Sequence, residues 1–242
     1  TDARVLLTYG GGSAKRTGTL DEVKEALAAS GNRQVFEFGG IEPNPEFVTL
    51  LKAADAVNEH NIDFILAVGG GSVIDGSKFV ALVSSLHDDD SVDGTVSREQ
   101  AWNALITGCK KLDSAVDLGA VSTIPATGSE MNSGGVVTYS ERQATLPFGN
   151  PLAFPKFSIL DPSKTLTLPE RQVMNGVADA FVHVMEQYLT YPVNAKVQDA
   201  FAESLLKILI DEGRAVKEDP ENMETRKNIM WTATMALIGL IG

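Results

Sequence analysis

Short apolar runs alternate with amphipathic stretches along the first two-thirds of the chain. The apolar runs predict strands at residues 5–9, 34–38, 64–68, 119–124, 136–139 and 157–160. The stretches between them predict helices, of which the clearest places five apolar residues on one stripe: Phe47, Leu50, Leu51, Ala54 and Val57. Strands that alternate with helices indicate an α/β fold with a parallel sheet covered on both faces.

Helix-start signals accompany several of these stretches. Thr19 and Glu22 have the spacing of a capping box, which predicts a helix over residues 19–30. Asn44 followed by Pro45 predicts the start of the next helix, and Ser97 is expected to cap another. The Asp-rich stretch at 88–94 predicts a solvated loop.

The pattern changes after residue 162. From there only helical periodicity is found, which predicts helices over 169–189, 195–217 and 221–240. We therefore expect an α/β domain over 1–162 and a mainly helical domain over 163–242. Residues 237–242 are uncharged and apolar, so the chain is expected to continue beyond them in the intact protein.

Composition excludes several classes of function. The 242 residues carry 20 basic and 32 acidic side chains, a net charge of −12, which argues against nucleic-acid binding. No apolar run reaches the roughly 20 residues of a membrane helix. Cys109 is the single cysteine, which excludes a disulfide framework, and only three histidines are present. No secretory signal is visible, so a cytoplasmic location is expected.

Two GGGS tetrapeptides, at 10–13 and 69–72, each join a predicted strand to a predicted helix. Glycines let backbone N–H groups approach an anion, and the helix start adds partial positive charge, so a pyrophosphate is the expected ligand. The alternative is a pair of tight turns without a ligand. Neither the G-x-G-x-x-G fingerprint nor the P-loop pattern fits, because Ile74 replaces a glycine and Ser77-Lys78 reverses the P-loop order.

Two further segments have polar groups near these loops. Lys15 and Arg16 follow the first loop and suit the 2′-phosphate of NADP, although two exposed surface cations are an equal alternative. Residues 123–132 follow the fourth predicted strand and are rich in hydroxyls, as expected of a ligand-binding loop at the carboxyl end of a strand. The alternative is a polar loop that caps a helix.

Asp179 and His183 lie four residues apart in a predicted helix, so both side chains share one face. Their neighbours, among them Val182, are apolar, which predicts a buried or cleft-lining helix. The pair suits a divalent metal such as Zn²⁺ or Fe²⁺. From spacing alone a buried Asp–His hydrogen bond is favoured, and Glu186 is expected to point to solvent.

These motifs occur together in a known order. The chain resembles the iron-containing (group III) alcohol dehydrogenases, in particular the NADP-dependent butanol dehydrogenase and aldehyde reductase branch. The resemblance covers nearly all of the chain and is carried by five stretches: YGGGS at 9–13, FGGIEPNP at 38–45, GGGSVIDGSK at 69–78, PATGSE at 125–130 and NGVADAFVH at 175–183. It implies a Rossmann-like dinucleotide-binding domain followed by an all-α metal-binding domain, truncated in this chain.

The resemblance also implies site residues. Those near NADP(H) would be Gly11, Gly12 and Ser13 at the 2′-phosphate end, Asn44 beside the adenosine, Gly69, Gly70, Gly71 and Ser72 around the pyrophosphate, Asp75 towards the nicotinamide, and Thr123, Thr127 and Asn132 along the cofactor. Asp179 and His183 would be two of four ligands to Fe²⁺ or Zn²⁺. The resemblance therefore favours the metal over the hydrogen-bonded pair.

The chain departs from the family in ways that bear on activity. The family supplies two later histidine ligands that these 242 residues lack, and Thr145 replaces a lysine expected near the nicotinamide ribose. We therefore interpret the chain as a fragment of a longer enzyme and expect it to be inactive alone, because catalytic metal sites use three or more protein ligands.

The function implied by the resemblance is hydride transfer between NADP(H) and a short-chain primary alcohol or aldehyde, with the metal as Lewis acid. The enzyme is expected to be a homodimer. Two alternatives remain: an enzyme related to glycerol dehydrogenase or dehydroquinate synthase, and a non-catalytic NADP-binding module.

Overall fold

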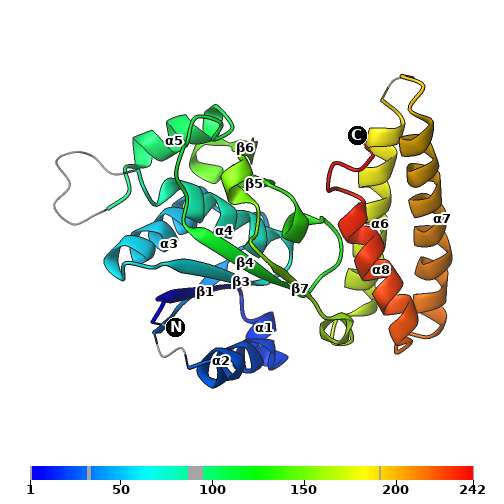
Figure 1. Cartoon of the computed structure of the whole chain (residues 1–242), viewed down its shortest axis with the longest axis horizontal. Coiled ribbons are helices and arrows are strands. Elements are labelled where there is room, and N and C mark those ends of the chain that lie inside the picture. Colours follow the sequence, from blue (N-terminus) through cyan, green and yellow to red (C-terminus); the bar gives the residue numbers. More distant parts are fainter. Residues whose placement is uncertain (1, 32–33, 87–94, 191, 242) are drawn as a thin grey trace. The chain divides into compact units, whose positions relative to one another are not determined.

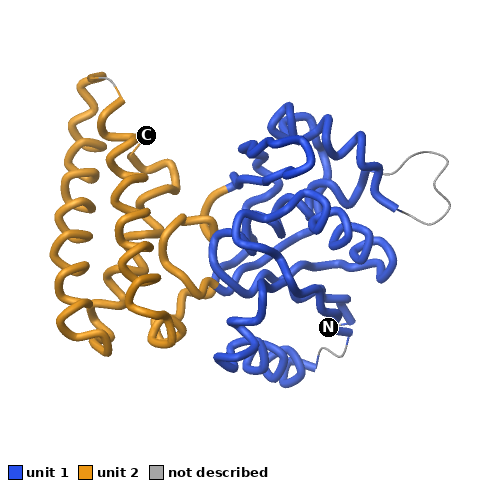
Figure 2. The backbone as a smooth tube through the Cα atoms, turned by 180° about the vertical axis from the view of Figure 1, so that it is seen from behind, with its two compact units in different colours: residues 1–121, 133–158 blue, residues 122–132, 159–242 orange. Residues whose placement is uncertain are grey.

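A computed structural model describes residues 2–31, 34–86, 95–190 and 192–241 (Figure 1). The chain divides into two compact units, residues 1–121 with 133–158 and residues 122–132 with 159–242 (Figure 2). The units do not follow the sequence in order, because the short segment 122–132 belongs to the second. The expected domain boundary at residue 162 stays a prediction. The predicted loop at 88–94 lies outside the described residues.

Four strands of a five-stranded sheet form the centre of the first unit, and residues 159–160 of the fifth strand belong to the second. The order of the sheet is β2-β1-β3-β4-β7. The strands are β1 (Val5–Gly10), β2 (Val35–Ile41), β3 (Phe64–Gly69), β4 (Asp117–Ser122) and β7 (Ser158–Leu160). β1 runs parallel to both of its neighbours, with Leu7 opposite Glu37 of β2 and Leu66 of β3. The predicted α/β fold is confirmed.

Helices cover both faces of this sheet. The helices of the first unit are α1 (Ser13–Arg16), α2 (Thr19–Ala29), α3 (Phe47–Glu59), α4 (Gly71–Val83) and α5 (Arg98–Ile106). Leu7 and Leu66 pack in one core with Leu20 of α2, whereas Leu6 and Ile65 pack in another with α3 and α4. Because both faces are covered, β1 and β3 carry apolar side chains at consecutive positions, which explains why their sequence pattern is nearly continuous.

A two-stranded hairpin, which the sequence pattern only half predicted, completes the first unit. β5 (Gly134–Tyr139) pairs antiparallel with β6 (Ala144–Gly149), from Gly134 opposite Gly149 to Tyr139 opposite Ala144. The second strand was missed because ATLPFG contains Pro147 and no regular alternation. A short 3₁₀ helix at Ser140–Arg142 connects the two strands, and another at Pro151–Ala153 follows the hairpin.

The second unit is helical. Its long helices are α6 (Glu170–Tyr188), α7 (Lys196–Glu218) and α8 (Met223–Met235), and two 3₁₀ helices lie at Ser129–Met131 and Pro162–Thr165. Its core consists mainly of small and branched side chains: Val173, Val177, Ala180 and Val184 of α6, Leu205 and Leu209 of α7, and Ile229 and Ala233 of α8. No helix among the described residues has both the length and the apolar character needed to cross a membrane.

Two of the predicted helix caps are wrong. Gly18, at φ 78°, is the N-cap of α2, and Thr19 is the buried first residue of the helix. Glycine takes this left-handed conformation more easily than threonine does. α3 begins at Phe47 with Glu46 as its N-cap, so Asn44 lies outside the helix. Ser97 is confirmed as the N-cap of α5, where its hydroxyl accepts a hydrogen bond from the Gln100 amide.

The predicted apolar stripe of α3 is confirmed, and Phe47 is fully buried within it. The Phe47 ring stacks on Tyr139 of β5 at 4.6 Å between centroids and meets Trp102 of α5 edge-on at 6.2 Å. One side chain thus joins α3 to the hairpin and to α5.

We expect Phe47→Ala to lower the free energy of unfolding by about 3–5 kcal/mol, because a buried ring is lost and a cavity remains. Urea unfolding followed by Trp102 fluorescence, in a Trp231→Phe background, measures this. Ile106→Ala is the matched control, because Ile106 is 52% exposed, and its effect should stay below about 0.5 kcal/mol. A loss at Phe47 no larger than the control's would contradict the packing described.

Candidate functional site

The two glycine loops lie side by side at one edge of the sheet. They directly follow β1 and β3, which are parallel neighbours with Tyr9 opposite Val68. The next strand along the chain from β1 is β2, which lies on the other side of β1 from β3. The strand order therefore reverses between β1 and β3. Open α/β sheets bind ligands at such a switch point, beyond the carboxyl ends of the strands.

The second loop leads directly into α4. Gly70 is the N-cap, with extended backbone, and no side chain caps the helix. The amides of Val73 and Ile74 bond to the Gly70 carbonyl, whereas the first N–H groups of a helix have no intrahelical acceptor. A Cβ on Gly69 would lie 2.6 Å from the Val73 side chain, so this position requires glycine. The uncapped start of a long helix, bordered by glycine, is suited to a phosphate.

The first loop is bordered by cations. Gly12, at φ 106°, is the N-cap of the short helix α1, whose last residues are Lys15 and Arg16. An Arg16 guanidinium nitrogen would lie 3.4 Å from a Cβ on Gly12, so this side chain folds back over the loop. Gly11 and Ser13 are exposed. The loop therefore combines an accessible backbone with two positive charges.

An acidic side chain near the first loop was missed by sequence reasoning. Glu37 lies on β2, where its carboxylate pairs with Lys24 at 2.5 Å and accepts a hydrogen bond from the Tyr9 hydroxyl at 3.2 Å. The bond from Lys24 lowers the pKa of Glu37. Strand register could have found it, because Glu37 lies opposite Leu7, which shares its face of the sheet with Tyr9.

Two predicted cofactor residues from distant parts of the chain meet beside the second loop. The backbone N–H of Asn44 donates to the Ser72 hydroxyl at 3.3 Å. Asn44 has φ 60°, a left-handed conformation that asparagine tolerates better than most residues. The structure therefore brings together Asn44 and the glycine loop, whereas the sequence had suggested a helix cap for Asn44.

Asp75 lies one turn into α4, and its carboxylate accepts a hydrogen bond from the Val136 amide at 3.2 Å. The side chain is half-buried between the helix and the hairpin. This contact links the second glycine loop, through α4, to β5. The link was not visible in the sequence because it joins residues 61 positions apart.

The other three predicted cofactor residues belong to segment 122–132 of the second unit. The Thr127 hydroxyl hydrogen-bonds with that of Ser129 at 2.7 Å. The Asn132 amide nitrogen donates to the carbonyls of Gly128, at 3.0 Å, and Leu237, at 3.2 Å. Thr123 is half-buried in the same segment. Their role towards a cofactor stays a prediction.

Segment 122–132 also carries a buried carboxylate to which the sequence assigned no role. Glu130 accepts a hydrogen bond from the Thr234 hydroxyl of α8 at 2.5 Å. A Cβ on Gly176 of α6 would lie 2.4 Å from the Pro125 carbonyl oxygen. The segment is therefore packed tightly between α6 and α8.

Asp179 and His183 face each other on α6, with 3.5 Å between a carboxylate oxygen and the imidazole Nε2. The side chains are 45% and 24% exposed, and Val182 is 50% exposed. The pair therefore lies on a partly exposed face of α6, and the expectation of a buried or cleft-lining helix stays a prediction. Interaction with Asp179 raises the pKa of His183, burial opposes this, and the charges of Asp179 and Glu186 reinforce it.

The described residues do not make up a complete metal site. Among them, no group of three or more His, Cys, Asp or Glu side chains is placed to hold a metal ion. Asp179 and His183 supply two ligands of suitable chemistry, whereas catalytic metal sites use at least three from the protein.

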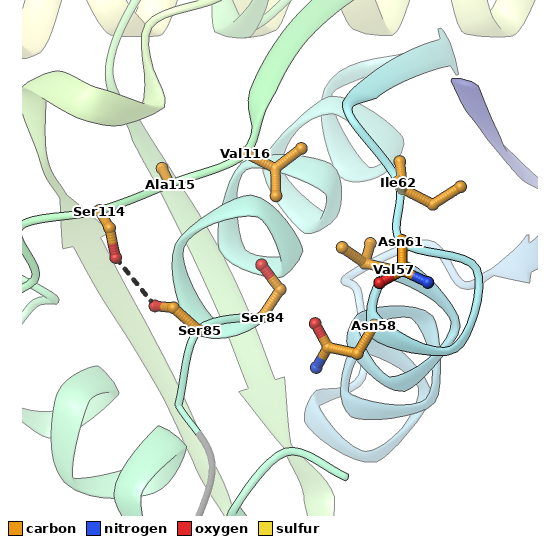
Figure 3. A pocket seen from close by; sticks show the side chains of 9 residues that line it. All are labelled: Val57, Asn58, Asn61, Ile62, Ser84, Ser85, Ser114, Ala115 and Val116. Atoms are coloured by element: carbon orange, nitrogen blue, oxygen red, sulfur yellow. Dashed lines mark hydrogen bonds between the residues drawn. The ribbon is translucent and has the colours of Figure 1, made fainter. Parts of the chain in front are cut away.

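A cavity of about 480 Å³ lies elsewhere in the first unit (Figure 3). It is lined by Val57, Asn58, Asn61, Ile62, Ser84, Ser85, Ser114, Ala115 and Val116. These residues belong to the last turn of α3, to the residues that follow α3 and α4, and to those that precede β3 and β4, at the edge of the sheet opposite the glycine loops. The lining carries no charged side chain. The cavity is therefore unrelated to the proposed phosphate site.

Comparison with known families agrees with this geometry. Residues 1–162 match the family described as iron-containing alcohol dehydrogenase, and residues 172–241 match the C-terminal part of the Fe-containing alcohol dehydrogenase family. The chain belongs to the iron-containing alcohol dehydrogenase family.

Individual members of this family are similar along nearly the whole chain. The NADPH-dependent aldehyde reductase YqhD of Escherichia coli K12 is 50% identical over 241 residues, which cover 100% of this chain and 59% of that protein. A probable NADH-dependent butanol dehydrogenase of Bacillus subtilis is 44% identical, over 98% of this chain and 58% of that protein.

Solved structures of the family have the same fold. The crystal structure of E. coli YqhD matches with a TM-score of 0.91 at 49% identity, covering 100% of this chain and 59% of that one. The structure of NADH-dependent butanol dehydrogenase A of Thermotoga maritima matches with a TM-score of 0.87 at 33% identity. The match covers 99% of this chain and 56% of that one. This chain thus spans between 56% and 59% of the length of these three relatives.

We expect the imidazole of His183 to titrate above its ordinary pKa of about 6.5 in the metal-free protein. NMR titration measures this. Asp179→Asn should return the pKa towards 6.5, and Glu186→Gln should lower it by less. Because the folded-state pKa is raised, the stabilisation by Asp179 is fully present below about pH 6.5 and is lost as pH rises through the folded-state value. A pKa unchanged in Asp179→Asn would contradict this.

Proposed function

We propose that this chain supplies the cofactor-binding part of an NADP(H)-dependent oxidoreductase, which transfers hydride between the cofactor and a short-chain primary alcohol or aldehyde. The observation that carries the proposal is the placement of two glycine loops side by side at the switch point of a parallel sheet. Family membership supports the reaction class, and the name of the E. coli relative supports NADPH and an aldehyde.

The pyrophosphate is proposed to lie at the N-terminus of α4. There the backbone amides of Gly71 and Ser72 would donate to its oxygens, and the helix dipole would favour its charge. Gly69 and Gly70 leave room for this approach because they have no side chain. Asn44, bonded to Ser72, would border the adenosine.

The 2′-phosphate is proposed to lie at the first loop, where Lys15 and Arg16 provide positive charge. In NAD enzymes an acidic residue near this position holds the 2′-hydroxyl. Glu37 is the acidic side chain near this loop, and its carboxylate is bound to Lys24 and Tyr9. This arrangement favours NADP(H) over NAD(H). The 2′-phosphate of NADP(H) would lie beside Lys15 and Arg16, whereas the Glu37 carboxylate that could bind a 2′-hydroxyl already bonds to Lys24 and Tyr9.

The metal, the substrate and the assembly complete the proposal. Asp179 and His183 are proposed as two ligands to a divalent metal, Fe²⁺ or Zn²⁺, whose other ligands are outside the described residues. The homodimer expected from the family resemblance is part of the same proposal.

Replacing Gly70 by valine tests the pyrophosphate assignment. The branched side chain would cover the start of α4 and remove about two charge-assisted hydrogen bonds, so NADPH affinity should fall about 100-fold. The quenching of protein fluorescence by NADPH measures the Kd.

Gly149→Ala is the control for glycine replacement, because a Cβ at Gly149 would meet nothing within 4 Å. It should leave both the Kd and the melting temperature unchanged. Unaltered NADPH binding by folded Gly70→Val would argue against the pyrophosphate assignment, and failure of the wild-type chain to bind NADPH would refute the proposed function.

The cations of the first loop should set the preference between the two cofactors. Lys15→Ala and Arg16→Ala should each weaken NADPH binding about tenfold, the effect of one lost charge-assisted contact, and leave NADH binding within about twofold. Lys111→Ala, an exposed lysine of the same unit, controls for net charge and should change neither Kd. Equal weakening of NADPH and NADH would show that the 2′-phosphate is bound elsewhere.

A further inference from the structure

No strand runs along the outer edge of β5, which instead bonds to two side chains of α4 and, through one β-bridge from Thr138 to Glu46, to the loop before α3. Val136 lies opposite Pro147, which has no N–H, so this pair cannot exchange both hydrogen bonds. In an antiparallel ladder, hydrogen-bonded pairs alternate with non-hydrogen-bonded pairs. The N–H and C=O groups of the non-hydrogen-bonded residues point away from the partner strand, so every second residue of β5 directs these groups outward. Accordingly, Gly134, Val136 and Thr138 bond to groups outside the hairpin.

Two of these outer bonds go to α4. The Lys78 ammonium donates to the Gly134 carbonyl at 2.8 Å, and the Val136 amide donates to the Asp75 carboxylate at 3.2 Å. The third goes to the loop before α3, where the Thr138 amide donates to the Pro45 carbonyl at 3.0 Å. α4 and β5 lie against each other (Figure 1). The hairpin is therefore attached to both segments that border the second glycine loop.

Lys78 is the buried residue among those that connect α4 to the hairpin. Its side chain is fully buried, and burying an ammonium is costly compared with burying an apolar chain of similar length. Gly71, Asp75 and Lys78 are spaced by four and three residues, so they share one face of α4. This face runs from the glycine loop to the buried ammonium, and the hairpin lies along it.

Ser77, the residue before Lys78, makes its contact on a different side of α4. The Ser77 hydroxyl bonds to that of Thr8 on β1 at 2.7 Å. Ser77 is about 100° from Lys78 and about 200° from Asp75 around the helix axis. α4 therefore has β1 and the first glycine loop on one side and the hairpin on another. A dinucleotide whose pyrophosphate lies at the start of α4 would therefore extend one nucleotide half towards the first glycine loop and the other towards the hairpin.

We propose that Lys78 is a positioning residue for the nicotinamide half of the cofactor. It holds β5 against α4, which orients Asp75 and makes the hairpin a wall beside that half. This role also explains why the Ser77-Lys78 order is reversed relative to a P-loop. Lys78 bonds to the hairpin and does not bind a phosphate. This inference rests on the proposed function.

The test compares NADPH with 2′,5′-ADP, which has the phosphorylated adenosine half and no nicotinamide. Lys78→Met keeps the chain length and removes the ammonium. We expect its Kd for NADPH to rise about tenfold, as for one lost hydrogen bond that positions the ligand, while its Kd for 2′,5′-ADP stays within about twofold. Both are measured by calorimetry on the full 242-residue chain.

Ser77→Ala is the matched control. It removes a buried hydrogen bond from the same turn of α4 but on the side of β1, so it should lower the melting temperature and leave the ratio of the two Kd values unchanged. A purely structural role for Lys78 would give the same result as this control. Such a result, or equal weakening of both ligands in Lys78→Met, would overturn the proposal.

A second measurement does not depend on the variant's folding. In the wild-type chain, hydrogen exchange of the β5 and β6 amides should slow with NADPH and change little with 2′,5′-ADP. Equal protection by both ligands would overturn the proposal. Failure of the wild-type chain to bind either ligand would refute the proposed function itself, whereas binding with unaltered selectivity in Lys78→Met would refute only the role of Lys78.

Discussion

The parallel pairing of β1 with β3 is the constraint on which the candidate site depends. Each strand ends in a glycine loop, and only because the two strands are neighbours with the same direction do both loops lie at one edge. The pairing in turn depends on burial of both sheet faces, by α2 on one side and by α3 and α4 on the other. A strand between β1 and β3 would separate the loops by a further strand spacing of about 5 Å.

Helix α4 connects this edge to the rest of the first unit. Its N-terminus lies in the second glycine loop, Ser77 joins it to β1, and Asp75 and Lys78 join it to the hairpin. The helix is buried along most of its length, so these polar contacts are made in an environment where an unpaired group would be costly. Such contacts specify one orientation of the helix, which apolar packing alone would specify less sharply.

In the second unit, the sequence motifs are also held by polar contacts. Glu130 and Asn132 attach segment 122–132 to α8 and the residues that follow it, and Gly176 lets α6 approach the same segment. The Asp179–His183 pair differs, because it lies on a partly exposed face of α6 and has no third potential ligand among the described residues. Family membership, and not local geometry, makes this pair a candidate for metal binding.

The sequence by itself determined the α/β class, most strand positions, the two glycine loops and the family, because these depend on local hydrophobic period and on contiguous motifs. It failed for the caps at Thr19 and Asn44, because α2 begins after the left-handed Gly18 and α3 begins two residues later than expected, with Glu46 as its N-cap. It also missed β6, the engagement of Glu37 and the attachment of the hairpin by Lys78. β6 was missed because Pro147 interrupts its local pattern. Only the tertiary structure decided the contacts of Glu37 and Lys78, because these depend on hydrogen bonds between residues distant in the chain, whose partners no local pattern specifies.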